Sequence, residues 1–344
     1  MSKTAIVLMN LGGPDSAQAV EPFLFNLFAD PAIIALPNPL RWLIAKIISH
    51  RRAPLAQKIY AHIGNASPLL ANTEAQARAL EQELGPDTKV FIAMRYWHPR
   101  AEAAAEAVKR FGADEIILLP LYPQFSRTTV ASSLSDWHRA AKKAGITATT
   151  RAICCYPTES GFIAALAEKI ATAFAEWPMT LKPPRLLLSA HGLPKRIVER
   201  GDPYEAQVNE TAAALRVALD RTDLDSVVCY QSRVGPLEWL GPATDHEIRR
   251  AGAEGRGLIV APIAFVSEHS ETLVELDIDY AHVARDAGVP RYVRVPTVGA
   301  APRFIAGLAD LVRQIRSAPD ERPVADGGAR RCDVSRVFCP CALR

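Results

Sequence analysis

The sequence carries little net charge and no cluster of basic residues. Its 40 Lys and Arg residues nearly balance 37 Asp and Glu residues, which leaves a net charge of +3, and no basic run with interleaved aromatic residues occurs. Proteins that bind nucleic acids usually present a strongly basic patch to the phosphate backbone. The charge balance therefore argues against nucleic acid as a partner.

Long hydrophobic runs are also missing. The most apolar stretch, residues 23–48, is interrupted by Asp30 and several prolines before it reaches the roughly 20 residues that a membrane span needs. The apolar start of the chain has no small-residue cleavage pattern behind it, so we interpret it as a first strand and not as a signal peptide. We therefore expect a soluble, cytoplasmic protein.

Two other signals are weak or incomplete. The glycines of the segment 11–14 follow the first apolar run but lack the full glycine fingerprint of a dinucleotide site, so no nucleotide cofactor is expected. Only six cysteines occur, and without a secretory signal we do not expect them to form structural disulfides.

Length and hydrophobic periodicity favour an α/β protein with two lobes. The chain has 344 residues with 49% hydrophobic content, which exceeds the usual size of a single core and suggests two lobes around a cleft. Apolar runs that resemble buried strands alternate with helix-period segments, as in parallel sheets flanked by helices. These runs are residues 5–9, 90–94, 116–121, 186–190, 226–230 and 258–264.

The motifs that follow these strands repeat in the same order. The matching pairs are residues 7–14 with 187–194, 94–99 with 230–236, and 119–126 with 261–267. This repetition predicts two Rossmann-like lobes of similar topology. We place an N-terminal lobe at 1–156 and a C-terminal lobe at 157–317, whose last helix, 302–317, is a candidate to pack back on the first lobe. Residues 318–344 are expected to be a flexible linker and a cysteine-rich tail.

Two polar motifs stand at predicted strand ends, where open α/β sheets bind ligands. One is the segment 189–194 with His191. The other contains Glu268, Glu271 and Glu275 at i, i+3 and i+7, along one face of a helix predicted to begin near Ser267. Neighbouring like charges repel by a few tenths of a kcal/mol per pair, so the row favours a divalent cation. A first helical turn that complements the helix dipole and an ordinary loop histidine are the alternatives.

Taken together, the motifs resemble those of ferrochelatases, the family that inserts ferrous iron into a porphyrin at the end of haem synthesis. The resemblance runs from about residue 7 to residue 315. It rests on LGGP at 11–14, RYWHP at 95–99, LYPQFS at 121–126, SAHGLP at 189–194, RGDPY at 200–204, QSRVGPLEWLGP at 231–242 and PIAFVSEHSETLVELDID at 262–279.

The resemblance implies a chelatase-type fold and a lyase that inserts Fe2+ into protoporphyrin IX, with release of two protons, in a porphyrin cleft between the lobes. Coproporphyrin III as the substrate, or another metal such as cobalt, is the closer alternative. A two-lobed carrier of haem or metal without catalysis is the more distant one. The sequence does not indicate the oligomeric state.

The family's metal-insertion residues correspond to His191 and Glu271, expected on facing lobes of the cleft and in contact with Fe2+. An imidazole accepts protons near neutral pH without a large pKa shift, which suits the removal of pyrrole protons. By the same resemblance, Glu268 and Glu275 continue an acidic track that carries either metal or protons.

The resemblance also implies the porphyrin contacts. Trp239 is expected to be an aromatic wall that helps to hold the ring in a bent shape, with core packing as the alternative. Tyr96 with Arg95 corresponds to the opposing polar contact, and Ser232 and Arg233 lie beside the ring. Either Arg95 or Arg233 would anchor a propionate.

An apolar lip around the pocket is implied for residues 23–28 and 40–48, which have basic residues nearby. Such a lip suits peripheral contact with an anionic bilayer surface. An ordinary amphipathic helix packed on the sheet is the alternative.

Some ferrochelatases carry a [2Fe-2S] cluster near a cysteine-rich C-terminus, and such a cluster needs four thiolates. The tail of this chain supplies Cys332, Cys339 and Cys341. Animal members have an internal cysteine ligand where this chain has Arg127, so Cys154 or Cys155 is the expected substitute. Cys229 lies in a predicted strand and is expected to face the core. Zinc bound by the same sulfurs, or free thiols, are the alternatives.

Overall fold

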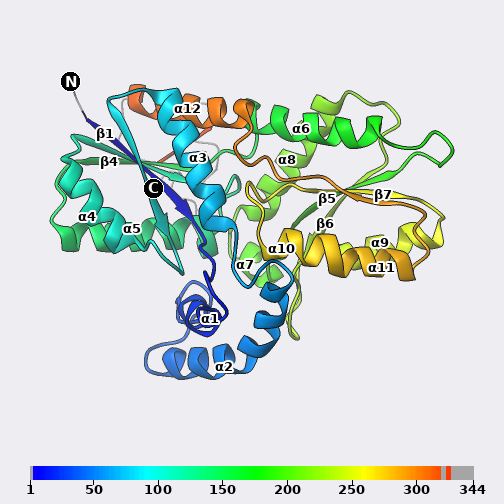
Figure 1. Ribbon diagram of the computed structural model, residues 1–344, viewed down its shortest axis with the longest axis horizontal. Coiled ribbons are helices and arrows are strands. Elements are labelled where there is room, and N and C mark those ends of the chain that lie inside the picture. The colour runs from blue at the N-terminus through cyan, green and yellow to red at the C-terminus, as the bar shows by residue number, and fades with distance from the viewer. Residues whose placement is uncertain (1–2, 319–322, 327–344) are drawn as a thin grey trace.

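Two parallel β-sheets form the framework of the protein (Figure 1). The computed structural model describes residues 3–318 and 323–326. The first sheet has the order β2 (Thr88–Met94), β1 (Thr4–Asn10), β3 (Glu115–Pro120), β4 (Thr149–Cys155) and β9 (Val324–Ala325). The second has the order β6 (Ser226–Gln231), β5 (Arg185–His191), β7 (Leu258–Pro262) and β8 (Tyr292–Arg294). The order β2-β1-β3-β4 has its counterpart in β6-β5-β7-β8, which confirms two α/β halves of similar topology.

Helices cover the faces of both sheets (Figure 1). The α-helices are α1 (Val20–Phe28), α2 (Leu40–Ala61), α3 (Leu69–Leu84), α4 (Ala101–Phe111), α5 (Ser132–Ala144), α6 (Ser160–Ala175), α7 (Lys195–Glu199), α8 (Tyr204–Leu219), α9 (Thr244–Ala253), α10 (Ser270–Leu273), α11 (Tyr280–Asp286) and α12 (Pro302–Ser317). Two π-helical segments, η1 (Arg127–Ala131) and η2 (Glu275–Asp279), precede α5 and α11. Because helices cover both faces, the central strands β1 and β5 are buried almost throughout and read as continuous apolar runs.

The predicted strands are all present, and three strands escaped prediction. β4 begins with the polar sequence 149–151, and β8 and β9 are too short to give an apolar run. β9 lies in the segment expected to be a flexible linker. Its residues Val324 and Ala325 pair with Ile153 and Cys155 of β4, so this part of the segment is a sheet strand and not a linker.

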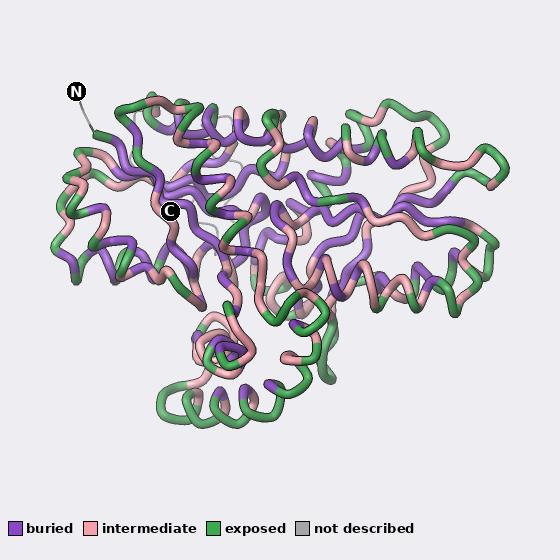
Figure 2. The backbone as a smooth tube through the Cα atoms, in the orientation of Figure 1, coloured by how far each residue is buried: buried purple, intermediate pink, exposed green. Residues whose placement is uncertain are grey.

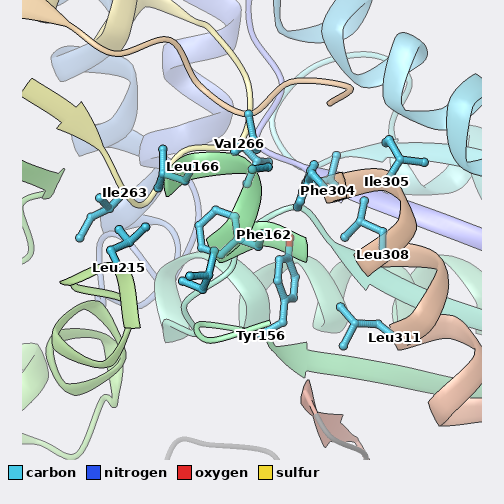
Figure 3. Packing of buried hydrophobic residues seen from close by; sticks show 14 of the residues in the cluster. Tyr156, Phe162, Leu166, Leu215, Ile263, Val266, Phe304, Ile305, Leu308 and Leu311 are labelled. Atoms are coloured by element: carbon cyan, nitrogen blue, oxygen red, sulfur yellow. The ribbon is translucent and has the colours of Figure 1, made fainter. Parts of the chain in front are cut away.

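One hydrophobic cluster runs through both halves (Figure 3). It joins Leu8 of β1 and Leu188 of β5 through the aromatic residues Tyr156, Phe162 and Phe304. Helix α12 packs against α3 and β4 of the first half as well as against α6. The boundary between residues 156 and 157 therefore lies inside a shared core, and we retain it as a proposal.

Helices α1 and α2 stand apart from the two sheets, below them in the view of Figures 1 and 2. Helix α2 packs on α1 and exposes much of its length to solvent, including Trp42 and Leu43. Nowhere in residues 3–318 and 323–326 does a helix combine the length and hydropathy of a membrane span.

Candidate active site

The carboxyl ends of β5 and β6 meet at one edge of the second sheet. β5 ends at His191 and β6 ends at Gln231, and the two residues are partners in the parallel register. Gly192 then carries the chain away in a tight space. A Cβ atom on this glycine would lie 2.7 Å from the carbonyl oxygen of Gln231 and 3.2 Å from the Trp239 ring, so the turn requires glycine.

His191 and Glu271 lie in direct contact at this edge. Nδ1 of the imidazole is 3.0 Å from Oε2 of the carboxylate, and their side chains are 39% and 30% exposed. Solvent and ligands therefore reach both groups. The expectation that the pair stands on facing lobes is wrong, because β5 and α10 both belong to the second half. The loop after β7 turns back over the edge of its own sheet and brings Glu271 to His191.

The contact changes the proton affinity of both groups. Burial alone would lower the pKa of His191, but the charge and hydrogen bond of Glu271, together with the charge of Glu275, raise it above its ordinary value. Burial would raise the pKa of Glu271, but His191 and His269 hold it well below its usual range. An ionised Glu271 fixes the proton of the neutral imidazole on Nδ1. The other ring nitrogen, Nε2, is then free to accept a proton.

A second histidine, His269, flanks the same carboxylate. Its Nε2 atom lies 3.4 Å from Oε2 of Glu271, and the residue is only 8% exposed. The Phe265 ring packs against both imidazoles, with its centroid 4.6 Å from that of His269 and 6.3 Å from that of His191. The sequence interpretation did not assign His269 to the site, although it belongs to the same motif as Glu271.

The three carboxylates do not share one helical face as predicted. Helix α10 begins at Ser270 with His269 as its N-cap, so Glu268 precedes the helix. The Glu268 carboxylate accepts hydrogen bonds from Arg294 at 2.7 Å and from the backbone amide of Thr297 at 2.9 Å. Burial opposes ionisation of Glu268, but Arg294 is the main cause of a pKa below the usual value.

Glu275 faces the loop that follows β6. Its carboxylate accepts hydrogen bonds from the backbone amide of Ser232 at 2.7 Å, from the Ser232 hydroxyl at 2.5 Å and from the Tyr280 hydroxyl at 3.0 Å. Ser232 adopts a positive φ of 60°, an uncommon conformation for a serine, which turns its amide toward Glu275. Glu275 and Ser232 therefore lie beside the pair, whereas Glu268 is directed to Arg294.

Trp239 and Arg233 border this part of the site. Trp239 is half-buried, forms an isolated bridge with Pro194 and packs against Gly192. Arg233 is exposed, and we find no ion pair for it in the part of the chain that the structure describes.

Arg95 and Tyr96 belong to a separate network in the first half. Asp30 is buried and accepts hydrogen bonds from the Arg95 guanidinium and from the Tyr96 hydroxyl, both at 2.8 Å, and from Ser132. A second carboxylate, Asp136, lies 3.6 Å from Arg95. Tyr96 is only 1% exposed. A cavity of about 340 Å³ opens beside this network and is lined by Asp30, Pro31, Ala32, Arg95, Arg127, Ala131, Ser132 and Ser135.

Two positioning contacts were not predicted. The hydroxyl of Tyr204 donates to the backbone carbonyl of His191 at 3.0 Å, and the amide of Gln231 donates to the backbone carbonyl of Glu271 at 2.8 Å. Both residues lie in motifs that carry the family resemblance, RGDPY and QSRVGPLEWLGP. The available signal was a polar residue at the end of an element, since Tyr204 begins α8 and Gln231 ends β6.

Only some of the expected cluster ligands fall within the described residues. Cys154 and Cys155 are buried at the end of β4, with their sulfur atoms 3.4 Å apart. Cys332, Cys339 and Cys341 lie outside the described residues. Cys229 faces the core, where it accepts a hydrogen bond from Thr244 at 3.3 Å, and burial raises the pKa of its thiol to about 12.

Comparisons with known proteins identify the family of the chain. A family model described as Ferrochelatase matches residues 3–315. The chain is 53% identical over 346 residues to a protein named Ferrochelatase from Phenylobacterium zucineum, with 98% of each chain covered. It is 51% identical over 347 residues to a protein of the same name from Caulobacter vibrioides, covering 98% of this chain and 97% of the other.

Solved structures show the same fold at low sequence identity. The structure of SirB from Bacillus subtilis with Fe3+ matches with a TM-score of 0.54 and 13% identity, covering 92% of this chain and 96% of that one. The sirohydrochlorin chelatase SirB from Bacillus subtilis subspecies spizizenii, in complex with cobalt, matches with a TM-score of 0.50 and 13% identity, covering 92% and 97%. At these identities the likeness supports the chelatase-type architecture alone.

Proposed function

The chain belongs to the ferrochelatase family and is a lyase of haem biosynthesis, and from this premise we propose that it inserts Fe2+ into protoporphyrin IX at the pair formed by His191 and Glu271. The observation that carries the proposal is the half-exposed imidazole that contacts an ionised carboxylate at the ligand-binding edge of a parallel sheet. Coproporphyrin III is the alternative substrate within the same reaction.

The reaction replaces two pyrrole protons by Fe2+, so the site must accept protons. His191 is the proposed acceptor of the two protons in turn, through its free Nε2 atom, and passes each one to the solvent that reaches its side chain. Glu271 stabilises the imidazolium that forms, because its carboxylate is held ionised against Nδ1. Together the two residues also offer the imidazole and carboxylate atoms that a ferrous ion accepts as ligands.

Glu275 is the better candidate to continue the acidic track. It lies beside the pair and is hydrogen-bonded to Ser232 and Tyr280, groups that carry no charge. The carboxylate of Glu268 is paired with Arg294, which also pairs with Asp277, so Glu268 belongs to a separate ion-pair network. We therefore propose that metal or protons move by way of Glu275, with Glu268 as a structural partner of Arg294.

The propionate anchor is assigned to Arg233 in preference to Arg95. The guanidinium of Arg95 is 14% exposed and already contacts Asp30 and Asp136, so its charge is compensated inside the protein. Arg233 is exposed and follows Ser232 beside the catalytic pair. Trp239, packed against Gly192, is the proposed wall against which the porphyrin ring is held in a bent shape.

We further propose a cytoplasmic protein that touches the membrane surface through the lip formed by α1 and α2. The exposed apolar side chains of α2 support this proposal, because a soluble monomer rarely presents such a row to water. The large side chains in this row are Leu40, Trp42, Leu43, Ile47 and Leu55. The basic residues between them suit an anionic bilayer.

A [2Fe-2S] cluster is proposed for the cysteine tail, and the described residues fit one of its ligands. Ala325 of β9 is the register partner of Cys155, so the chain that leads to the tail passes beside this thiol. Gln207 donates an N–H group to the sulfur of Cys155 at 3.4 Å, a contact of the kind that tunes cluster sulfurs. Cys155 with the three tail cysteines would hold the cluster. Zinc at the same sulfurs is the alternative.

Anaerobic insertion of Fe2+ into protoporphyrin IX and coproporphyrin III tests the function. Purified wild-type protein is expected to form protohaem faster than coprohaem, and His191→Ala is expected to lower kcat by about 10²-fold or more. A preference for coproporphyrin III would replace the proposed substrate. Retention of wild-type kcat by His191→Ala would refute the assignment of the proton acceptor.

A further inference from the structure

Side chains of the first half reach into the segment that carries Glu271. This segment, residues 263–269, joins β7 to α10 in the second half. Three amide side chains donate to its backbone carbonyls: Gln124 to Ile263 at 3.1 Å, Gln76 to Val266 at 3.0 Å, and Asn72 to Glu268 at 3.0 Å. None of these amides contributes to the chemistry proposed above.

Gln76 makes the most contacts of the three. It lies on α3 and is fully buried. Its amide nitrogen donates to the carbonyl oxygens of Val266 and Gly299, both at 3.0 Å, and its amide oxygen accepts from the Ser267 hydroxyl at 3.1 Å. A side-chain amide offers two donors and an acceptor, and all of them are used here. The Val266 side chain itself packs in the shared core (Figure 3), so the segment is held on two sides.

Helix α10 is too short to fix its own position. It comprises only Ser270–Leu273 and follows directly on the held segment. Such a short helix is stable only through its surroundings. The backbone of Glu271 is held from the other side by Gln231 of β6. The carboxylate therefore stands between a support from the first half and a support from the second.

We propose that Gln76, assisted by Asn72, is a positioning residue that sets where Glu271 lies relative to His191. The first half would thus influence the reaction through α3 without touching the reacting pair. This inference rests on the proposed function of His191 and Glu271. A positioning role differs from a purely structural one because its effect on the rate depends on the Glu271 carboxylate. A displacement of about 1 Å in a catalytic group is enough to lower a rate by up to about 10²-fold.

The test compares Gln76→Met with Thr73→Val. Thr73 is also fully buried on α3, but its hydroxyl donates to Leu69 at 2.7 Å and accepts from Asn10 at 3.0 Å, both in the first half. Each variant loses buried hydrogen bonds, so both should lower the midpoint of thermal unfolding. Only Gln76→Met is expected to lower kcat, by about tenfold, with an unchanged KM for porphyrin. Thr73→Val should keep kcat within about twofold of the wild type.

Each change is then repeated in a Glu271→Gln background. If Gln76 acts through the carboxylate, its replacement should lower kcat there by less than about twofold, because the effects of coupled residues are not additive. An equal loss of kcat in both backgrounds, or full kcat in Gln76→Met alone, would overturn the inference. If Gln76→Met does not fold, Asn72→Ala, at a half-buried position, is measured by the same criteria.

The same measurements distinguish failure of this inference from failure of the proposed function. Wild-type kcat in Glu271→Gln alone would refute the role of the pair. A large loss in Glu271→Gln combined with no loss in Gln76→Met and Asn72→Ala would refute only the positioning role.

Discussion

At the scale of single residues, the protonation of His191 follows from its contact with Glu271. The carboxylate raises the pKa of the imidazole, and below that pKa Nε2 is protonated and accepts no pyrrole proton. The acid limb of kcat/KM should therefore lie above the ordinary histidine pKa of about 6.5. In Glu271→Gln the raising charge is gone, so the limb should move to lower pH while kcat falls by about 10²-fold.

Initial rates of Fe2+ insertion across the neutral pH range check this prediction. Glu268→Gln is the control, because its carboxylate is directed to Arg294 and its loss should leave the limb in place. An acid limb at the same pH in Glu271→Gln and in the wild type would contradict the assignment.

The two candidate arginines should respond differently to replacement. Arg233→Ala removes an exposed side chain and should raise the KM for protoporphyrin IX about tenfold without loss of stability. Arg95→Ala leaves the buried Asp30 carboxylate without its ion pair and should cost about 3–5 kcal/mol of unfolding free energy. Steady-state kinetics with protoporphyrin and its dimethyl ester, together with denaturant unfolding, measure both effects. The ester should abolish the difference between wild type and Arg233→Ala, and an unchanged difference would rule out propionate anchoring.

The motifs of single segments predicted His191 and Glu271, but not how the chain brings them together. The loop that carries Glu271 turns back within the second half, so a prediction of facing lobes was wrong. Tyr204 and Gln231 were missed because their contacts join separate segments of the chain. His269 stands two residues before Glu271, and its contact with that carboxylate depends on the fold of the turn before α10. The charge of Glu268 suggested a metal track, and only the tertiary structure reveals its partner Arg294.

At the scale of elements, α2 presents its apolar side chains to solvent. Replacing Trp42 and Leu43, which are 53% and 51% exposed, by serine should weaken binding to anionic liposomes by about tenfold or more while leaving the fold intact. Liposome co-sedimentation at fixed lipid concentration gives the bound fraction. Val217→Ser on α8, where the side chain is 79% exposed, is the matched control and should bind like the wild type. Equal binding by all three proteins would argue against a membrane role for the lip.

The pairing of β4 with β9 yields a test for the cluster. Cys155→Ser should lose the visible absorption and the acid-labile sulfide of the purified protein, whereas Cys229→Ser, whose thiol is buried in the core of the second half, should retain both. Metal analysis of the same preparations distinguishes iron from zinc. Full cluster content in Cys155→Ser, with loss in Cys154→Ser, would move the ligand to the neighbouring cysteine.

Periodicity predicted the elements whose residues are uniformly apolar or strictly amphipathic. The helix predicted at 302–317 matches α12, and the central strands match β1 and β5. The helix predicted to begin near Ser267 begins at Ser270 instead. The i, i+3, i+7 spacing of the three carboxylates suggested one continuous helix, but His269, which lies within that spacing, is the N-cap of α10. β9 could not be predicted, because two residues carry no periodicity and their pairing with β4 is a long-range contact.

At the scale of the whole molecule, length predicted two lobes, whereas the structure joins them by one core. The junction depends on close contact between α6 and α12, which no local pattern encodes. A Cβ atom on Gly161 would lie 2.2 Å from the carbonyl oxygen of Arg303, and one on Gly307 would lie 2.2 Å from the Glu159 carboxylate. Glu159 in turn caps α6 by accepting from the amide of Phe162 at 2.7 Å.

Gly307→Ala should therefore disturb both halves at once. The added methyl group forces Glu159 from its capping position or separates the helices, at a cost of roughly 1–3 kcal/mol. Helix α12 contacts α3 and β4 of the first half, and α6 contacts β7 of the second half. The loss of unfolding free energy should therefore appear in a single cooperative transition of the whole protein. Denaturant unfolding followed separately at Trp137 and at Trp177 should give coincident curves, both shifted.

Asp310→Ala, on the exposed side of the same helix, is the control and should change the free energy of unfolding by no more than about 0.5 kcal/mol. Two separate transitions, of which only one shifts in Gly307→Ala, would mean that the halves unfold independently and that the shared core does not couple them.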